Sequence, residues 1–391
     1  MSESNDPRSL SRRDFFRKCL LGGAACLAAP ALRSAGQLAT LAGAAPGKLG
    51  AVSHHVALFW TPAGGTDTRC HVCPRQCDIK VGERGFCGVR ENQGGKYVSL
   101  VYGYPAVVRA DPMEKGPFFH YLPGTKTIAL GTAGCNLDCK YCQSWQFAQA
   151  RPEQTDNKYL PPESLVAQTK QLGLPSITFT FSEPMACPEY VIDTGKAARR
   201  AGIKVLIHTA AYALKEPLLE VCKWVDAVNV DFKGYSHSFY KNVTGGDLDT
   251  VLAGIKTIAS TGVWLELTTL VIPGYNDDPG MFARGCQWIV SNLGRDVPLH
   301  VSRFFPQYKL RNVPPTPKDT LKTLRRIGYE QGMNYVYLGN LGGDPGESSY
   351  CPCCGIPLIG RVGYHVSFDG LDPRTGRCRK CGLRIPGKWL A

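Results

Sequence analysis

The feature that most constrains the fold is a strand–helix alternation that begins near residue 126. Short apolar runs that predict strands lie at 127–130, 176–181, 204–207, 227–230, 264–271 and 298–303. Amphipathic runs that predict helices lie at 163–172, 189–201, 216–225, 248–260, 281–293 and 318–331, and several of them end at glycine. Because parallel strands need crossover connections of this length, the alternation predicts an α/β fold with a parallel sheet.

Six strand–helix units are fewer than the eight of a closed (β/α)8 barrel. We therefore expect a partial, open (β/α)6 barrel over residues 126–340, with a further strand at 335–338 on one edge. Folds of this class carry their chemistry at the carboxyl ends of the strands. Polar and thiol residues do follow the predicted strands: Cys135, Cys139, Cys142, Ser182, Glu183, His208, Asp231, Lys233, Ser302 and Arg303.

The formal net charge of +13 is concentrated at the two ends of the 391-residue chain. Residues 1–35 hold six Lys/Arg against three Asp/Glu, and residues 351–391 hold seven against two. The rest of the excess is spread too thinly over the centre to form a stripe that follows phosphates. We expect no nucleic-acid partner.

The cysteines are numerous and grouped. There are seventeen in all, and twelve fall within residues 70–87, 135–142 and 351–381. Disulfide scaffolds belong mainly to small secreted chains that lack a core, whereas this chain is long enough to bury one. Spacings of two or three residues suit thiolates that converge on one metal centre.

The first 35 residues predict a targeting segment. Arg12-Arg13 and Phe15-Phe16 precede an apolar stretch, a pattern typical of a twin-arginine export signal. Residues 36–69 predict a linker with one strand near 56–60. No other stretch reaches the length of a membrane span, so we expect no integral span after processing.

The central motif is Cys135-x3-Cys139-x2-Cys142, directly after the first predicted strand. Three thiolates can hold three irons of a 4Fe–4S cluster and leave the fourth iron free to bind a ligand. This spacing and position resemble the radical S-adenosylmethionine superfamily. The resemblance implies a 4Fe–4S cluster that reductively cleaves S-adenosylmethionine and releases a 5'-deoxyadenosyl radical for hydrogen abstraction.

The same resemblance suggests residues that contact the cofactor. Tyr141 matches the aromatic residue that packs near the adenine in the family. Glu183 and Ser182 stand where the family has a Gly-Gly-Glu motif, whose carboxylate pairs with the methionine ammonium; the two glycines are absent here.

Two further segments resemble the activating enzymes of pyruvate formate-lyase. Asp231-Phe232-Lys233 resembles their Asp-Leu-Lys segment, and residues 272–277 resemble one of their loops. Lys233 is a candidate for the methionine carboxylate or a substrate anion, and an ordinary solvated lysine is the alternative. His208 is a candidate at the carboxyl ends of the strands.

We expect residues 70–125 to form an N-terminal module, because four cysteines lie close together in it: Cys70, Cys73, Cys77 and Cys87. Zinc and a second iron–sulfur cluster both fit four cysteines at this spacing. Two disulfides are the alternative if the protein is exported.

The range 341–391 predicts a C-terminal ribbon in which Cys351 and Cys354 pair with Cys378 and Cys381. Two C-x2-C knuckles of this kind are typical of a zinc ribbon or a rubredoxin-type iron site. Structural zinc is the first expectation and iron the second. The spare Cys353 is expected to point away from the metal.

Taken in the order in which they occur along the chain, the motifs of residues 65–391 resemble the radical enzyme of the three-part AmmeMemoRadiSam system, a relative of the pyruvate formate-lyase activating enzymes. The resemblance implies a reductant protein such as flavodoxin or ferredoxin, and a protein substrate or the other components of that system. An exported iron–sulfur electron-transfer or scaffold protein that never cleaves the cofactor is the alternative function. The export signal favours the periplasm or a membrane-associated location, whereas the need for S-adenosylmethionine favours the cytoplasm.

Overall fold

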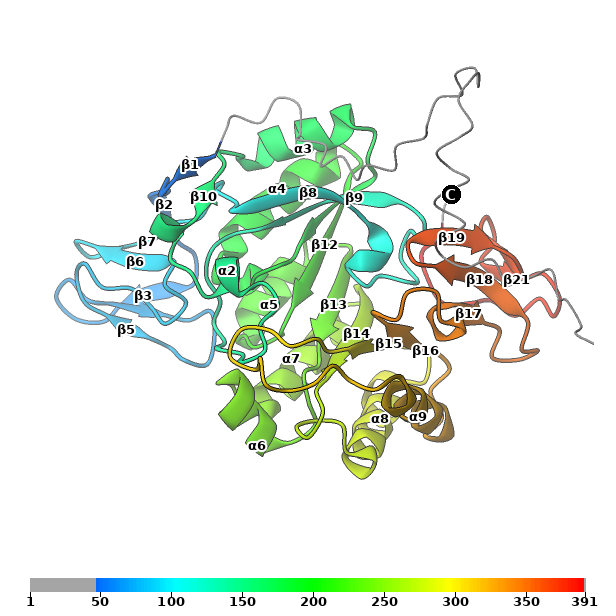
Figure 1. Ribbon diagram of the computed structural model, residues 1–391. Coiled ribbons are helices and arrows are strands. Elements are labelled where there is room, and N and C mark those ends of the chain that lie inside the picture. The colour runs from blue at the N-terminus through cyan, green and yellow to red at the C-terminus, as the bar shows by residue number, and fades with distance from the viewer. Residues whose placement is uncertain (1–46, 390–391) are drawn as a thin grey trace, which may run out of the picture. The chain divides into compact units, whose positions relative to one another are not determined.

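A computed structural model describes residues 47–389 of the chain (Figure 1). The predicted export signal at 1–35 lies outside these residues. The main element is an eight-stranded sheet in the order β16-β15-β14-β13-β12-β11-β9-β8. Its strands are β8 Val107–Pro112, β9 Lys126–Gly131, β11 Ser176–Phe179, β12 Lys204–Thr209, β13 Ala227–Asp231, β14 Trp264–Val271, β15 Leu299–Arg303 and β16 Val336–Gly339.

The seven strands from β9 to β16 are parallel to their neighbours, as the alternation predicts. β11 is buried along its whole length, and β13 at every residue except Asp231. A strand covered on both faces is expected to be a continuous apolar run, which is why these strands are visible in the sequence. Among the described residues β8 and β16 each have one neighbour in this sheet, so it is open rather than closed.

Helices follow the parallel strands, as Figure 1 shows. Each long helix buries one stripe; α7, for example, buries Leu248, Val251, Ile255 and Ile258. Within the described residues, no helix is both long enough and apolar enough to cross a membrane. The α-helices are α2 Trp145–Ala148, α3 Pro162–Gln171, α4 Pro188–Arg200, α5 Lys215–Cys222, α6 His237–Phe239, α7 Leu248–Ser260, α8 Pro279–Leu293 and α9 Lys318–Glu330. The short helical turns are η1 Met113–Lys115, η2 Pro152–Gln154, η3 Pro184–Ala186, η4 Tyr240–Thr244 and η5 Pro345–Glu347.

The N-terminal part differs from the expectation in two ways. β8 falls in the range assigned to the N-terminal module, 70–125, yet it pairs antiparallel with β9 in the main sheet. The range expected to be a linker, 36–69, contains paired strands in its described part. Strands of two to four residues are too short to show a periodic pattern, which explains why the short strands were not predicted. The short strands are β1 Lys48–Leu49, β2 His55–Val56, β3 Trp60–Pro62, β4 Thr68–Cys70, β5 Asp78–Ile79, β6 Arg90–Gln93, β7 Lys96–Ser99 and β10 Asp156–Asn157.

The C-terminal part is a small antiparallel unit. It comprises a three-stranded sheet, β17-β18-β19, and a two-stranded sheet, β20-β21. Its apolar cluster includes Leu358, Ile359 and Leu371 together with Tyr337 in β16 and Tyr335 directly before it. The ribbon therefore shares a core with the edge of the main sheet. Its strands are β17 Ser349–Tyr350, β18 Pro357–Val362, β19 His365–Phe368, β20 Leu371–Asp372 and β21 Arg377–Cys378.

Candidate active site and cysteine centres

A cavity of about 640 Å³ lies at the carboxyl ends of the parallel strands. Residues that follow or end β9, β11, β12 and β13 line it together, because parallel strands bring these ends to one edge. The structure thus brings together all eight residues predicted for the cluster and its cofactor: Cys135, Cys139, Tyr141, Cys142, Ser182, Glu183, His208 and Lys233.

The three-cysteine loop follows β9 and is held by neighbours on both sides. The Cys135 Sγ accepts a hydrogen bond from the Leu137 amide at 3.4 Å. The Asn136 side chain donates to the Tyr212 carbonyl at 2.7 Å, and Arg75 Nε donates to the Asn136 carbonyl at 2.9 Å. The loop is therefore fixed by the N-terminal module as well as by the sheet.

The loop residues suit a bound metal group and ligand. Burial raises the pKa of the Cys139 thiol to about 12, although the nearby Lys233 ammonium opposes the shift. A bound cation favours the thiolate instead, because metal ligands must be deprotonated. Tyr141 is buried, lines the cavity, and its Oη has no hydrogen-bond partner among the described residues. A buried polar atom without a partner at a cavity wall fits a ligand that would supply one.

Glu183 is only 3% exposed, so it is not a surface residue before a proline. Its Oε1 accepts from the Met185 amide at 2.9 Å and from Thr209 Oγ1 at 2.6 Å, and its Oε2 accepts from the Ala210 amide at 2.9 Å. Burial nevertheless raises its pKa. A carboxylate offers about four acceptor positions, so room for one more donor remains. Two neighbours orient this carboxylate: Thr209, which follows the third predicted strand together with His208, and Ala210, whose backbone amide no residue pattern marks.

Lys233 belongs to a buried ionic group rather than to a solvated surface. Its Nζ lies 2.8 Å from Asp231 Oδ2, and its side chain is 13% exposed. His208 Nε2 lies 3.1 Å from the other Asp231 oxygen. Burial works against ionisation of Asp231, but the charges of Lys233 and His208 keep its pKa below the usual range.

The two segments that resemble the activating enzymes, residues 231–233 and 272–277, are in contact. Asn276, fully buried in the loop after β14, donates through Nδ2 to the Lys233 carbonyl at 2.8 Å and to the Leu270 carbonyl at 2.9 Å. Its Oδ1 accepts from the Ile272 amide at 2.6 Å. Asn276 thus fixes the loop that carries Lys233.

The C-terminal part contributes to the wall of the cavity, which the sequence did not predict. Glu347, Gly363 and Tyr364 line the cavity together with His300 on β15. The His300 Nε2 lies 2.7 Å from Glu266 Oε2, and both side chains are buried. No signal in the sequence connects the ribbon to the cavity, because the contact depends on how the ribbon packs.

The N-terminal cysteines lie outside this cavity. β4 ends at Cys70, β5 begins directly after Cys77, and the Cys70 amide donates to the Cys77 carbonyl at 3.0 Å. A second cavity of about 640 Å³ is lined by both Cys87 and Cys135. The N-terminal module and the three-cysteine loop are therefore adjacent.

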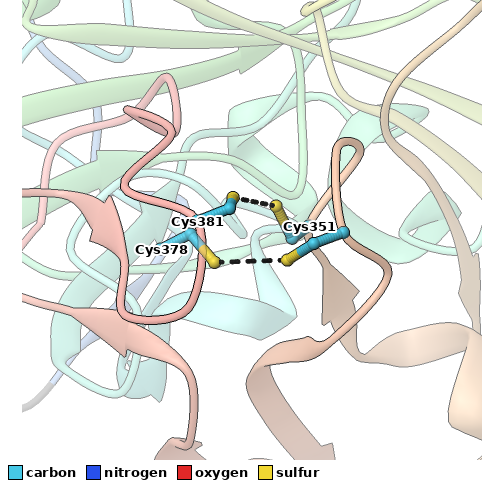
Figure 2. Close-up of side chains that lie close together, drawn as sticks. Cys351, Cys378 and Cys381 are labelled. Atoms are coloured by element: carbon cyan, nitrogen blue, oxygen red, sulfur yellow. Dashed lines mark hydrogen bonds between the residues drawn. The ribbon is translucent and has the colours of Figure 1, made fainter.

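The four predicted ribbon cysteines form a metal-binding group. In Figure 2, Cys378 and Cys381 lie on one loop and face Cys351, which lies on a second loop. The sulfurs of Cys351 and Cys381 are 3.5 Å apart, those of Cys354 and Cys378 are 3.6 Å apart, and all four lie within 4.8 Å of one another. A tetrahedral ion with metal–sulfur bonds near 2.3 Å separates its sulfurs by about 3.8 Å.

The backbone of the ribbon knuckles supports the same arrangement. Gly355 and Gly382 have φ values of 72° and 74°, so the chain turns back after each second cysteine. Burial opposes thiolate formation at Cys378, but the Lys380 and Cys381 amides donate to it and lower its pKa to about 7. Cys353 is exposed and is not a member of the group, as expected.

Comparison with known proteins identifies a family and several relatives of this chain. The pattern of the Radical SAM superfamily matches residues 130–284. The uncharacterized protein MJ0808 of Methanocaldococcus jannaschii is 40% identical over 329 residues, which cover 84% of this chain and 98% of that protein. The pyruvate formate-lyase-activating enzyme of Clostridium pasteurianum is 26% identical over 52% of this chain and 90% of its own length. A solved domain of a pyruvate-formate lyase-activating enzyme from Bacteroides vulgatus gives a TM-score of 0.37 at 20% identity, over 42% of this chain and 98% of that domain.

The matched range begins in β9 and ends in α8, so it contains the three-cysteine loop, Glu183, His208 and Lys233. A family of enzymes that use a 4Fe–4S cluster and S-adenosylmethionine accounts for both the cysteine spacing and the cavity. The chain belongs to the radical S-adenosylmethionine (SAM) superfamily.

Proposed function

We propose that this protein reductively cleaves S-adenosylmethionine at a 4Fe–4S cluster held by Cys135, Cys139 and Cys142. The observation that carries the proposal is one cavity that joins these thiols to the buried Glu183 carboxylate and to the unpartnered Tyr141 Oη. Bound at the open iron, S-adenosylmethionine supplies a 5'-deoxyadenosyl radical for hydrogen abstraction.

The residues of the chain hold and orient this ligand. Each of the three thiolates binds a different iron. Glu183 is already fixed by three hydrogen bonds, so little side-chain entropy is lost when its remaining acceptor position takes a hydrogen bond from the methionine amine. This amine would bind the open iron in its neutral form. Lys233, held by Asp231, supplies a positive charge for a carboxylate, and Tyr141 places its ring and its free Oη near the adenine. Ser182 and His208 complete the wall.

The partners follow from the relatives. Proteins named pyruvate formate-lyase-activating enzyme and 4-hydroxyphenylacetate decarboxylase activating enzyme are among the relatives of this chain. By analogy we propose as partners a reductant protein such as flavodoxin or ferredoxin, and either a protein substrate or the other components of an AmmeMemoRadiSam system. For the location, the twin-arginine-type signal favours the periplasm or the membrane, whereas the need for S-adenosylmethionine favours the cytoplasm.

For the ribbon we propose structural zinc. Four thiolates with no open position are typical of structural zinc, whereas a catalytic zinc keeps one position free. Iron in a rubredoxin-like site is the alternative. Metal analysis of protein purified without added iron distinguishes zinc from iron.

The test is anaerobic reconstitution with iron and sulfide, followed by S-adenosylmethionine and dithionite and a chromatographic assay for 5'-deoxyadenosine. We expect 5'-deoxyadenosine from the parent and none from the variant with Cys135, Cys139 and Cys142 changed to Ala. Cys353→Ser is the matched control, because Cys353 is exposed and outside each group, and it should behave as the parent does. Full cleavage by the triple variant would refute the proposal and favour the electron-transfer or scaffold function.

A further inference from the structure

The N-terminal module brings four cysteines into one region of the fold. Cys70 and Cys77 lie at the facing ends of β4 and β5, and Cys73 lies in the turn between them. The Phe86 amide donates to Cys77 Sγ at 3.5 Å, which brings the next residue, Cys87, to the same place. Cys70 and Cys73 are buried, and Cys77 and Cys87 are partly buried.

The backbone around these sulfurs repeats a feature of the ribbon. Gly88 follows Cys87 with a φ of 74°, close to the values at Gly355 and Gly382. The chain turns tightly beside two of the cysteines, since the Gln76 amide donates to the Cys73 carbonyl at 3.1 Å and the Gly88 amide to the Gly85 carbonyl at 2.9 Å, and the Phe86 amide points at the Cys77 sulfur. Amides aimed at a sulfur stabilise a thiolate bound to a metal and tune the centre.

Two buried donors beside the cysteines have no partner. Arg90 is 1% exposed, and although its Nη1 lies 3.2 Å from Glu189, its Nε has no hydrogen-bond partner among the described residues. The Oη of Tyr97, which is also buried, lacks a partner in the same part of the chain. A Cβ at Gly85 would lie 3.2 Å from Tyr97 Oη and 3.7 Å from Cys77 Sγ, and the Arg90 guanidinium lies 5.3 Å from the centre of the Tyr97 ring, so both side chains lie beside the cysteines. Buried donors without acceptors indicate that an anionic group belongs there.

The separation of the sulfurs distinguishes a cluster from a single ion. The ribbon sulfurs all lie within 4.8 Å of one another, as one ion requires, but within residues 47–389 the four N-terminal cysteines do not form such a group. A cubane attaches each thiolate to a different iron, so it holds its thiolates farther apart than one zinc does.

We propose that Cys70, Cys73, Cys77 and Cys87 bind a second 4Fe–4S cluster. Its thiolates and sulfides would provide the acceptors that Arg90 Nε and Tyr97 Oη lack. Unlike the first cluster, it has four protein ligands and no open iron, so it is suited to electron transfer rather than to binding a ligand.

The position of the module suggests what the second cluster does, and this part rests on the proposed function. Cys87 and Cys135 line the same cavity, and a side chain at Gly134 would collide with the Cys87 carbonyl and with Val89. One electron from a one-electron donor protein would reduce the second cluster and then pass to the first, with no bond made or broken in the module. A reductant protein would therefore dock on the N-terminal module.

Acid-labile sulfide tests the cluster directly, because neither zinc nor a rubredoxin-like iron in the ribbon contributes sulfide. After anaerobic reconstitution of the full chain, we expect about eight sulfides per chain in the parent. The variant with Cys135, Cys139 and Cys142 changed to Ala should keep about four, with an electron paramagnetic resonance signal on reduction. This variant leaves the module intact, so misfolding of the module does not confuse the result. Adding Cys77→Ser to it should lower the sulfide further, whereas adding Cys353→Ser should not.

Loss of all labile sulfide in the triple variant would overturn the inference, whether the module then holds zinc or two disulfides. A different result would count against the proposed function. If the triple variant kept the same sulfide as the parent, at about four per chain, the three-cysteine loop would hold no cluster while the second cluster stood.

Discussion

Phe181 has a φ of 65°, a left-handed conformation that non-glycine residues rarely adopt. It stands where the superfamily motif has its first glycine, and Phe181, Ser182 and Glu183 all line the cavity. In a residue other than glycine this conformation costs of order 1–3 kcal/mol. The sequence predicted the place of Glu183 but not the strain, because strain depends on backbone angles that a residue pattern does not show.

Glu183→Gln should weaken binding of S-adenosylmethionine by about tenfold to more than a hundredfold. The change removes one charge-assisted hydrogen bond in a buried site, worth about 1.5–3 kcal/mol. Titration of the reconstituted protein with S-adenosylmethionine measures the affinity, and an unchanged visible spectrum shows that the cluster has assembled. Glu163→Gln, at an exposed carboxylate, is the control and should bind as the parent does. Parental affinity in Glu183→Gln would show that this carboxylate does not contact the ligand.

The long elements could be predicted because their patterns are strong. Parallel strands buried on both faces are apolar runs, and helices such as α7 bury a stripe with helical spacing. β8 and most of the short strands β1 to β5 were not predicted, because strands of two or three residues show no periodic pattern and nothing in the sequence indicates that β8 pairs with β9. The loops could be predicted in part. Residues 272–277 were recognised by resemblance, but the hydrogen bond from Asn276 to the Lys233 carbonyl could be found only in the structure.

Asn276→Ala should lower the free energy of unfolding by about 2–4 kcal/mol, because it leaves three buried backbone groups without their partners. Chemical denaturation of the apoprotein measures the change. Asn292→Ala is the control, since Asn292 is exposed and makes one hydrogen bond to the Trp288 carbonyl. Equal stability of the two variants would mean that Asn276 does not join the loops after β13 and β14.

At the scale of the whole molecule, the ribbon and the main sheet share both a core and a cavity wall. Arg361 Nη2 donates to the Phe119 carbonyl at 2.8 Å, and His120 Nδ1 lies 2.7 Å from the Pro386 carbonyl. The sequence predicted the ribbon and its four ligands as a separate module. It could not predict that Tyr364 reaches the cavity, because only the packing of the two parts brings them together.

Changing Cys351, Cys354, Cys378 and Cys381 to Ala should remove about one metal ion per chain and lower the melting temperature by at least about 5 °C, because structural metal binding is folding energy. Elemental analysis and thermal denaturation measure the two effects, and Cys353→Ser is the control. Unchanged metal content in the quadruple variant would show that the ribbon holds no ion.

The most direct test of the central claim is the electron paramagnetic resonance spectrum of the reduced protein with S-adenosylmethionine labelled with ¹⁵N at its methionine amine. The account predicts that binding alters the cluster spectrum and that a nitrogen hyperfine coupling changes with the isotope, because the amine binds the open iron. The triple variant of Cys135, Cys139 and Cys142 should show neither effect. A parental spectrum that is the same with and without S-adenosylmethionine, and the same for both isotopes, would contradict the claim.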